Sequence, residues 1–462
     1  MAHPYMPSSA EKDKATMIAA TGIVDIEELF EQIPPDHYAK RPINLPPGLR
    51  SEVAVHRHLT DLLRKNRSCA ENLNFLGAGY WQHYVPAVCD EIAGRSEFLT
   101  SVWGTPSSDH GRNQAWFEFA SQLGALVDLE FVGLPVYSWG AAAAFGLRMA
   151  TRITGRSTVL VAGPADPERL GVIRTYCAGE DGEDAISVSV IPVDPATGRA
   201  DVHAISQQLS PDVAAVYVET PNYLGQIETG LAELARLARA NGSETVVGVD
   251  PISLGVLVPP ARLGADIVVG TTQPLGIHLN AGGGVGGFIA TRDEERYASQ
   301  YPTLQVSICD TLTPGERAFG MTLFHQSSYG SREQGNDWTG NSVYLWTVVN
   351  AVYMALLGPA GFRELGDTIL AGSHYAAEKL SRIPGVTVLW PDGFFKEFVL
   401  RFDDGYSVAD INAALLAKNI FGGKDLTADF PELGNSALYC VTEMHAAADI
   451  DTLAAALTEV LA

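Results

Sequence analysis

The chain has 462 residues and a formal net charge of −23, with 46% hydrophobic and 18% charged residues. This length and composition are typical of a globular protein with a large core, and they exclude a disordered chain. The negative charge repels phosphates and anionic headgroups, so we expect neither nucleic acid nor a membrane surface as a partner.

The five cysteines are scattered and lack the spacing of a metal site or a disulfide framework. We therefore expect free intracellular thiols and no bound metal. No apolar run approaches the roughly 20 residues of a membrane span. The N-terminal residues lack the apolar core of a signal peptide, so we expect a soluble, cytoplasmic protein.

Residues 1–66 are expected to form an N-terminal arm and a helix. Residues 1–20 are polar, and we expect them to be poorly ordered. Apolar residues at helical spacing follow over 21–32, and the proline-rich stretch 33–49 then predicts an extended arm. Residues 51–66 predict an amphipathic helix. Arms of this kind commonly lie across a neighbouring subunit.

Alternating strands and helices predict a large α/β domain over residues 67–345. Strands are expected at 157–162, 185–193, 213–220, 244–250 and 265–270, and helices at 83–92, 114–126, 167–178, 202–209 and 228–240. Repeated βαβ units predict a mostly parallel sheet with helices on both faces.

The loop that leads into the Ala-rich helix after residue 138 is a candidate phosphate site. Helix N-termini bind anions through free backbone N–H groups and the helix dipole. Ser138, Gly140 and Ala141 are its candidate residues. A core helix with a serine cap explains the same sequence equally well.

The region 297–345 is irregular and rich in polar and aromatic residues, and a loop of that length is more often functional than idle. An apolar helix over 342–357 follows. Residues 346–462 are expected to form a smaller α+β domain. It comprises a helix that ends at 380, strands at 386–390, 397–402 and 436–443, a helix at 407–418 and a final Ala/Leu-rich helix.

The stretch 246–288 suggests where chemistry occurs. One apolar strand ends on Asp250, and a second apolar run leads into a loop that contains Gln273. An α/β enzyme presents an acid and a catalytic loop in this way, at the carboxyl ends of neighbouring strands. The chain has no lysine between Lys65 and Lys379.

Ten segments from about residue 20 to the C-terminus occur in a family's order and spacing: EELFEQIP, NFLGAGYWQHYVPAV, RSEFLT, TPNYLGQIE, VDPISLGVLVPP, GADIVVG, QPLGIHL, GPAGFREL, FFKEFVL and VTEMH. In these segments the chain resembles the glycine decarboxylase P-protein family. The resemblance is to the α-subunit (subunit 1) of its split bacterial form.

The resemblance implies a PLP-dependent transferase fold of type I, with a mixed, mostly parallel sheet in the large domain and a smaller C-terminal α+β domain. It implies the first step of glycine cleavage, in which glycine is decarboxylated on pyridoxal phosphate (PLP) and its aminomethyl group passes to a lipoyl carrier protein. In the split form a β-subunit carries the PLP-binding lysine, and Gln273 stands at that position here. Asp250 is implied to pair with the PLP ring nitrogen.

Three stretches depart from the family pattern. The family has YTPYQPE-SQG at 101–111, MYDGATA at 136–142 and KATSNICTNQ at 335–342, and this chain has different residues at all three. The framework segments are kept while these pocket-facing stretches change together. That pattern favours a repurposed site.

The candidate site residues follow from these segments. Candidate catalytic residues are His110 and His278, ranked above His83 and His325, and Gln273, whose amide could hydrogen-bond a ligand or equally serve a conformational role. Candidate cofactor-binding residues are Ser138, Gly140, Ala141, Asn222 and Asp250; candidate pocket residues are Trp103, Tyr137, Trp139 and Asn336. The alternatives are structural. A histidine most often serves a structural hydrogen bond, a tryptophan is usually buried packing, and a strand-end aspartate often caps a turn.

Three functions stay open at this point. In the first, the chain is an α-type subunit that shapes a PLP site with a lysine-bearing β-type partner. In the second, it is a homodimer with altered chemistry on an amino-acid-like substrate, with non-covalent PLP or none. In the third, it is a non-catalytic scaffold. The retained framework favours the first.

Overall fold

The computed structural model describes residues 3, 5–39, 41, 43–98, 110–179, 185–283, 285–322, 335, 337, 339 and 343–462. The chain divides into two compact units, Met1–Arg67 and Ser68–Ala462. Within the described residues, no helix combines the length and apolar character that crossing a membrane requires.

The first unit consists of short helices: η1 (Pro7–Ser9), α1 (Glu11–Thr21), η2 (Ile26–Phe30) and α2 (Glu52–Leu63). The expectation of a poorly ordered start is wrong over α1. Acidic residues in the first turn of α1 interact favourably with the helix dipole, and Gly22, with a φ of 79°, ends the helix. Within the range of the expected helix 21–32, only the shorter η2 is present. Asp25 and Glu28 form a capping box at its N-terminus. Neither α1 nor α2 buries a residue.

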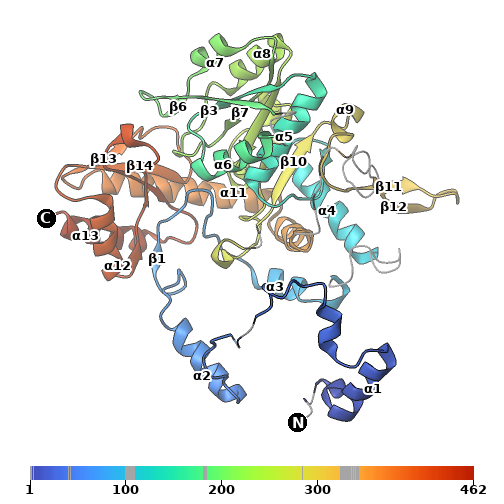
Figure 1. Cartoon of the computed structure of the whole chain (residues 1–462). Helices are drawn as coiled ribbons and strands as arrows, with labels where there is room; N and C mark the ends of the chain where they lie inside the picture. Colours follow the sequence, from blue (N-terminus) through green and yellow to red (C-terminus); the bar gives the residue numbers. More distant parts are fainter. Residues whose placement is uncertain are drawn as a thin grey trace. The chain divides into compact units, whose positions relative to one another are not determined.

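A seven-stranded sheet forms the centre of the second unit (Figure 1). Its strands in spatial order are β2 (Phe131–Val132), β10 (Gly287–Thr291), β9 (Ile267–Thr271), β8 (Glu244–Val249), β7 (Val213–Glu219), β3 (Thr158–Ala162) and β4 (Ser187–Ile191). The run from β9 to β4 is parallel, while β10 and β2 pair antiparallel. The predicted mostly parallel sheet is confirmed.

Helices cover both faces of this sheet. They are α3 (Ala87–Ala93), α4 (His110–Val127), α5 (Trp139–Thr154), α6 (Pro167–Cys177), α7 (Val202–Gln208), α8 (Leu231–Asn241) and α9 (Glu295–Ala298). Alternate residues of a strand enter different cores: Val246 packs with α5, and Val247 packs with residues of α4 and α8. This two-sided burial explains the nearly continuous valine runs of β7 to β9.

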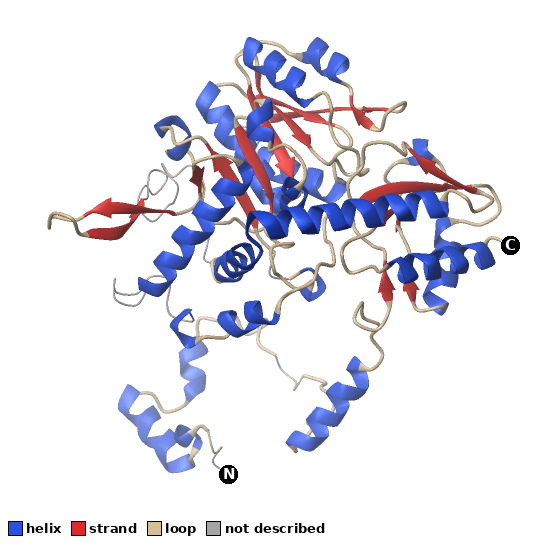
Figure 2. Ribbon diagram, turned by 180° about the vertical axis from the view of Figure 1, so that it is seen from behind, coloured by secondary structure: helices blue, strands red, loops and turns tan. Residues whose placement is uncertain are grey.

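A second sheet near the C-terminus is antiparallel, in the order β13 (Val386–Leu389), β14 (Glu397–Phe402), β17 (Ser436–Cys440) and β16 (Lys424–Asp425). The helices α12 (Val408–Ala417) and α13 (Ala447–Val460) contribute to its core. The long helix α11 (Trp346–Leu380) joins the two sheets, as Figure 2 shows from behind. It kinks at Gly358, which has a φ of 53° just before Pro359.

A short parallel pair ties the start of the second unit to its end, because β1 (Leu73–Asn74) pairs with β15 (Ile420–Phe421). The boundary predicted at residue 345 stays a prediction. The remaining short elements are η3 (Ser96–Phe98), β5 (Val193–Asp194), β6 (Arg199–Ala200), η5 (Pro251–Gly255), η6 (Pro260–Leu263), η7 (Asn280–Gly282) and η9 (Pro431–Leu433).

The region expected to be irregular contains a β-hairpin, formed by β11 (Gln305–Asp310) and β12 (Arg317–Thr322). It projects from the rest of the unit in Figure 1. Polar and apolar residues alternate along β11, and a Thr-Pro-Gly turn follows. This is the period of a strand, and the prediction overlooked it because the flanking sequence is so polar.

Candidate active site

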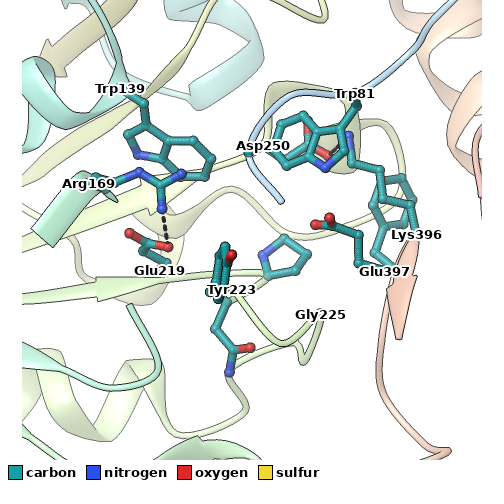
Figure 3. A pocket seen from close by; sticks show the side chains of 13 residues that line it. Trp81, Trp139, Arg169, Glu219, Tyr223, Gly225, Asp250, Lys396 and Glu397 are labelled. Carbon is teal, nitrogen blue, oxygen red and sulfur yellow. Dashed lines mark hydrogen bonds and ion pairs between the residues drawn. The ribbon is translucent and has the colours of Figure 1, made fainter. Parts of the chain in front are cut away.

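A pocket lies at the carboxyl ends of β7 and β8, where an open α/β sheet usually binds its ligand. The C-terminal sheet closes one side of it through the residues that lead into β14. Figure 3 shows the side chains. The lining residues are Gly79, Trp81, Trp139, Arg169, Glu219, Pro221, Asn222, Tyr223, Gly225, Asp250, Phe395, Lys396 and Glu397.

Asp250 follows β8 directly and caps η5 by accepting a hydrogen bond from the Ile252 N–H at 3.1 Å. Its second oxygen lies 2.8 Å from the ammonium of Lys396. Both side chains are almost completely buried, at 4% and 3% exposure. The acid predicted from the strand pattern is therefore present, and a lysine of this same chain already pairs with it.

Lys396 makes two further contacts. Its Nζ lies 3.4 Å from the centre of the Trp81 ring and 3.2 Å from Nε2 of His83. His83 Nδ1 in turn lies 2.8 Å from Glu443. Burial disfavours the charged form of Glu443, but His83 and the Tyr84 N–H outweigh it, and the pKa of Glu443 falls below its usual value. The result is a buried chain of charged and polar groups that runs from Asp250 to Glu443.

Gln273 lies in the loop after β9, and its side chain is buried. Its oxygen accepts from the Trp81 N–H at 3.2 Å, and its NH₂ donates to the carbonyls of Trp81 at 3.0 Å and Ile277 at 3.1 Å. The amide therefore holds the Trp81 segment against its own loop. This geometry favours a conformational role over the predicted catalytic one.

Trp139, a candidate pocket residue, is among the lining residues, and its ring face is covered. The Arg169 guanidinium lies 3.7 Å from the ring centre and forms a 2.6 Å ion pair with Glu219. Burial raises the pKa of Glu219, and Tyr217 donates a hydrogen bond to it at 2.8 Å. Arg169 also pairs with Asp166 at 3.2 Å. The ring face on which a planar ligand could stack is thus occupied by an arginine.

At the candidate phosphate site, backbone N–H groups at the start of α5 are bonded to the capping residue of the helix itself. Ser138 caps α5, with its hydroxyl accepting from the Ala141 N–H at 3.1 Å and its carbonyl accepting from the Ala142 N–H at 2.9 Å. Gly140 is buried, and a Cβ there would lie 3.0 Å from Val172. These contacts match the alternative interpretation of a capped core helix.

Asn222 lies in the pocket wall and organises the turn after β7. Its NH₂ donates to the Gly198 carbonyl at 2.9 Å and to Glu228 at 2.8 Å, and its oxygen accepts from the Leu224 and Gln226 N–H groups. Burial raises the pKa of Glu228 to about 7, although Asn222 and the Ala200 N–H partly oppose the shift. The hydrogen bonds of Asn222 therefore stabilise the conformation of this turn.

The other predicted residues lie elsewhere. His278 is exposed, pairs with Asp90 at 3.1 Å and is not among the lining residues. Tyr137 is half-buried against the core beneath α5, and His110 is the first residue of α4. Trp103, Asn336 and His325 lie outside the described residues.

The pocket brings together three predicted residues, Asp250, Asn222 and Trp139, and the sequence analysis missed the charged groups around them. These are Arg169, Glu219, Lys396 and Glu397. One signal was available for Lys396, because it stands between apolar residues in the segment FFKEFVL. The apolar neighbours indicate that this segment is buried, and a lysine is seldom buried unless it is paired with an acid.

PLP does not fit this pocket as it stands. The cavity leaves about 20 Å³ for the centres of water molecules, which is room for about one water. Small-molecule pockets span roughly 300–1,000 Å³. Asp250 is engaged by Lys396, and Arg169 covers Trp139. Among the described residues, no group of three His, Cys, Asp or Glu side chains is placed to hold a metal ion.

Comparison with known proteins identifies close relatives. The family model of the glycine cleavage system P-protein matches residues 3–457. A probable glycine dehydrogenase (decarboxylating) subunit 1 from Pyrococcus horikoshii is 36% identical over 100% of both chains. The protein of the same description from Staphylothermus marinus is 34% identical over 99% of this chain and 98% of its own length.

Solved structures agree. The crystal structure of glycine decarboxylase (P-protein) in inhibitor-bound form superposes with a TM-score of 0.87, at 31% identity and 100% coverage of both chains. A sphingosine-1-phosphate lyase from Burkholderia pseudomallei matches with a TM-score of 0.64 and 16% identity, over 92% of this chain and 94% of that chain, which shows the fold alone. The predicted fold class, the type I fold of PLP-dependent transferases, is confirmed.

Proposed function

Because the chain belongs to the glycine cleavage system P-protein family, we propose that it acts as subunit 1 of a glycine decarboxylase, together with a lysine-bearing second subunit. The observation that carries this proposal is the ion pair of Asp250 with Lys396 in a pocket that has no room for PLP. Since the described residues of this pocket leave no room for the cofactor, we infer that a partner supplies the cofactor site.

The position of Gln273 supports the same division of labour. An amide cannot form the imine that anchors PLP, and here all its polar atoms bind backbone groups of Trp81 and Ile277. We therefore place the cofactor, and the decarboxylation of glycine that it supports, on the partner subunit. The lipoyl carrier protein is then the acceptor of the aminomethyl group.

The roles predicted for His110, Trp103 and Asn336 are part of this proposal. They rest on the resemblance, which assigns their segments to the active site of the assembly. The competing proposal is a stand-alone homodimer that acts on an amino-acid-like substrate. The three changed stretches favour it, while the filled pocket counts against a ligand larger than a water molecule at Asp250.

The experiment compares the purified chain alone with a mixture of the chain and a lysine-bearing homologue from the same genome. We expect the chain alone to show no PLP absorbance band before or after borohydride and dialysis. We expect the mixture to co-elute on gel filtration and to release CO₂ from glycine when lipoylated carrier protein is present. A PLP band that survives dialysis in the chain alone would instead support the homodimer.

A further inference from the structure

Lys396 is a buried cation in the wall of the pocket. It directly precedes β14 of the C-terminal sheet, whereas Asp250 directly follows β8 of the central sheet. The 2.8 Å pair between them therefore bridges two sheets, at side-chain exposures of 3% and 4%. A buried lysine and a buried aspartate are each costly alone, so each of these residues requires the other.

The contacts of the ammonium group are complete. It forms the 2.8 Å ion pair with Asp250, lies 3.2 Å from Nε2 of His83 and lies 3.4 Å from the centre of the Trp81 ring. For His83 Nε2 to accept this hydrogen bond, the His83 proton must be on Nδ1, which faces Glu443 at 2.8 Å. The ring face of Trp81 adds a cation–π contact, which favours a charged lysine in a dry site.

Two further acidic residues line the pocket: Glu397, the next residue along the chain, and Glu219 on β7. Glu397 is buried beside the lysine, accepts from the Ala78 N–H at 2.6 Å, and burial raises its pKa. Glu219 on β7 is compensated by Arg169 and not by Lys396. Without the lysine, Asp250 would face a buried carboxyl group and would have no ion-pair partner among the residues that the structure describes.

In a PLP enzyme of this fold, the positive partner of the strand-end aspartate is the protonated ring nitrogen of the cofactor. We propose that Lys396 is an internal substitute for that ring: its ammonium compensates Asp250, its side chain fills space beside Trp81, and both effects exclude PLP from this chain. The pocket thereby stays folded and closed without a cofactor. This inference deepens the proposed function, but it concerns this chain alone.

The test is a binding measurement on the purified chain without its partner. The probe is pyridoxamine phosphate, which has the cofactor ring and phosphate but no aldehyde to react with surface lysines. We expect Lys396→Ala to bind the probe at least about tenfold more tightly than the wild type. The double variant Asp250→Asn/Lys396→Ala removes the partner of the ring nitrogen, and we expect it to lose that gain.

The matched control is Lys379→Ala. Lys379 pairs with Asp451 at 2.6 Å in an exposed ion pair, so this variant should bind the probe as the wild type does. Equal binding by the wild type and a folded Lys396→Ala variant would overturn the proposal. So would a gain of the same size in Lys379→Ala.

A second measurement serves if Lys396→Ala does not fold. The apolar, similarly long Lys396→Met is combined with Asp250→Asn, and urea unfolding is compared among both single variants and the double variant. We expect the double variant to be more stable than either single variant, because neither charge is left unpaired. A double variant that is less stable than both would overturn the proposal. Since no partner subunit is present, these results are independent of whether the assembly decarboxylates glycine.

Discussion

Gly225 packs directly on the backbone of Glu397: a Cβ at Gly225 would lie 1.9 Å from the Glu397 carbonyl oxygen. Gly225 belongs to the turn after β7, and Glu397 begins β14, so this contact joins the two sheets beside the pocket. Only glycine allows an approach this close, and its φ of 88° is also one that glycine adopts without strain.

Gly225→Ala should therefore destabilise the chain by about 3–5 kcal/mol, since the backbone of Glu397 must move as well as that of residue 225. Gly155→Ala is the matched control, because Gly155 has a φ of 68° but open space around its Cα. Gly155→Ala should destabilise the chain by only about 1–2 kcal/mol, because alanine is strained in the left-handed backbone conformation. Urea unfolding of both variants measures the difference, and equal losses would contradict the close approach.

Arg169→Met should destabilise the fold by about 3–5 kcal/mol, because it leaves Glu219 buried without its cation. Part of the loss should return at low pH, where Glu219 binds a proton. Arg236→Met is the control, since Arg236 pairs with Glu233 in an exposed pair, and it should leave the midpoint unchanged. Urea titrations at neutral and acidic pH provide the measurement. If Arg169→Met behaves like the control, the network is not a stabilising one.

Glu228→Gln should change how stability depends on pH. The folded-state pKa of Glu228 is raised from 4.5 to about 7, so the folded chain holds this proton more tightly than the unfolded chain does. Its contribution is complete below about pH 4 and is lost as the pH rises through 7. The variant keeps an oxygen for the Ala200 and Asn222 donors and cannot ionise.

We therefore expect Glu228→Gln to be more stable than the wild type by about 3 kcal/mol above pH 8, with the difference vanishing near pH 4. Guanidinium unfolding across this range measures it. Glu364→Gln, at an exposed helix position, is the control, and its stability relative to the wild type should not depend on pH. A difference that does not depend on pH would contradict the raised pKa.

Gln273→Ala should destabilise the chain by about 2–4 kcal/mol, because it leaves the N–H and carbonyl of Trp81 and the carbonyl of Ile277 without their partners. Trp81 fluorescence should also change as its segment loosens. Gln207→Ala, at an exposed helix position, is the control. If Gln273→Ala keeps full stability and only lowers glycine decarboxylation in the assembly, the catalytic prediction for Gln273 would be favoured instead.

The sequence identified Asp250, Asn222 and Trp139 because each stands at the end of a strand or the start of a helix, and parallel strands bring those positions to one edge. It did not identify Lys396 or the pair of Arg169 with Glu219, because Asp250 and Glu219 are distant from them in the sequence and only the docking of the C-terminal sheet and α6 brings them close. The helix α1 and the hairpin β11–β12 were missed for a different reason. Their polar composition concealed the capping and alternation that define them.

Because β1 pairs with β15, the start of the second unit can complete its native contacts only after the C-terminal part has been synthesised. Leu73 and Phe75 bond to Asn419 and Phe421, and Phe75 and Gln82 accept hydrogen bonds from Cys440 and Thr442. At typical translation rates of 5–20 residues per second, the early segment waits roughly 20–70 s on the ribosome for these partners. During that interval its apolar residues, including Phe75 and Trp81, have no native cover from the C-terminal sheet. A nascent chain that stops before residue 419 therefore lacks the partners that hold the segment 73–82 in place.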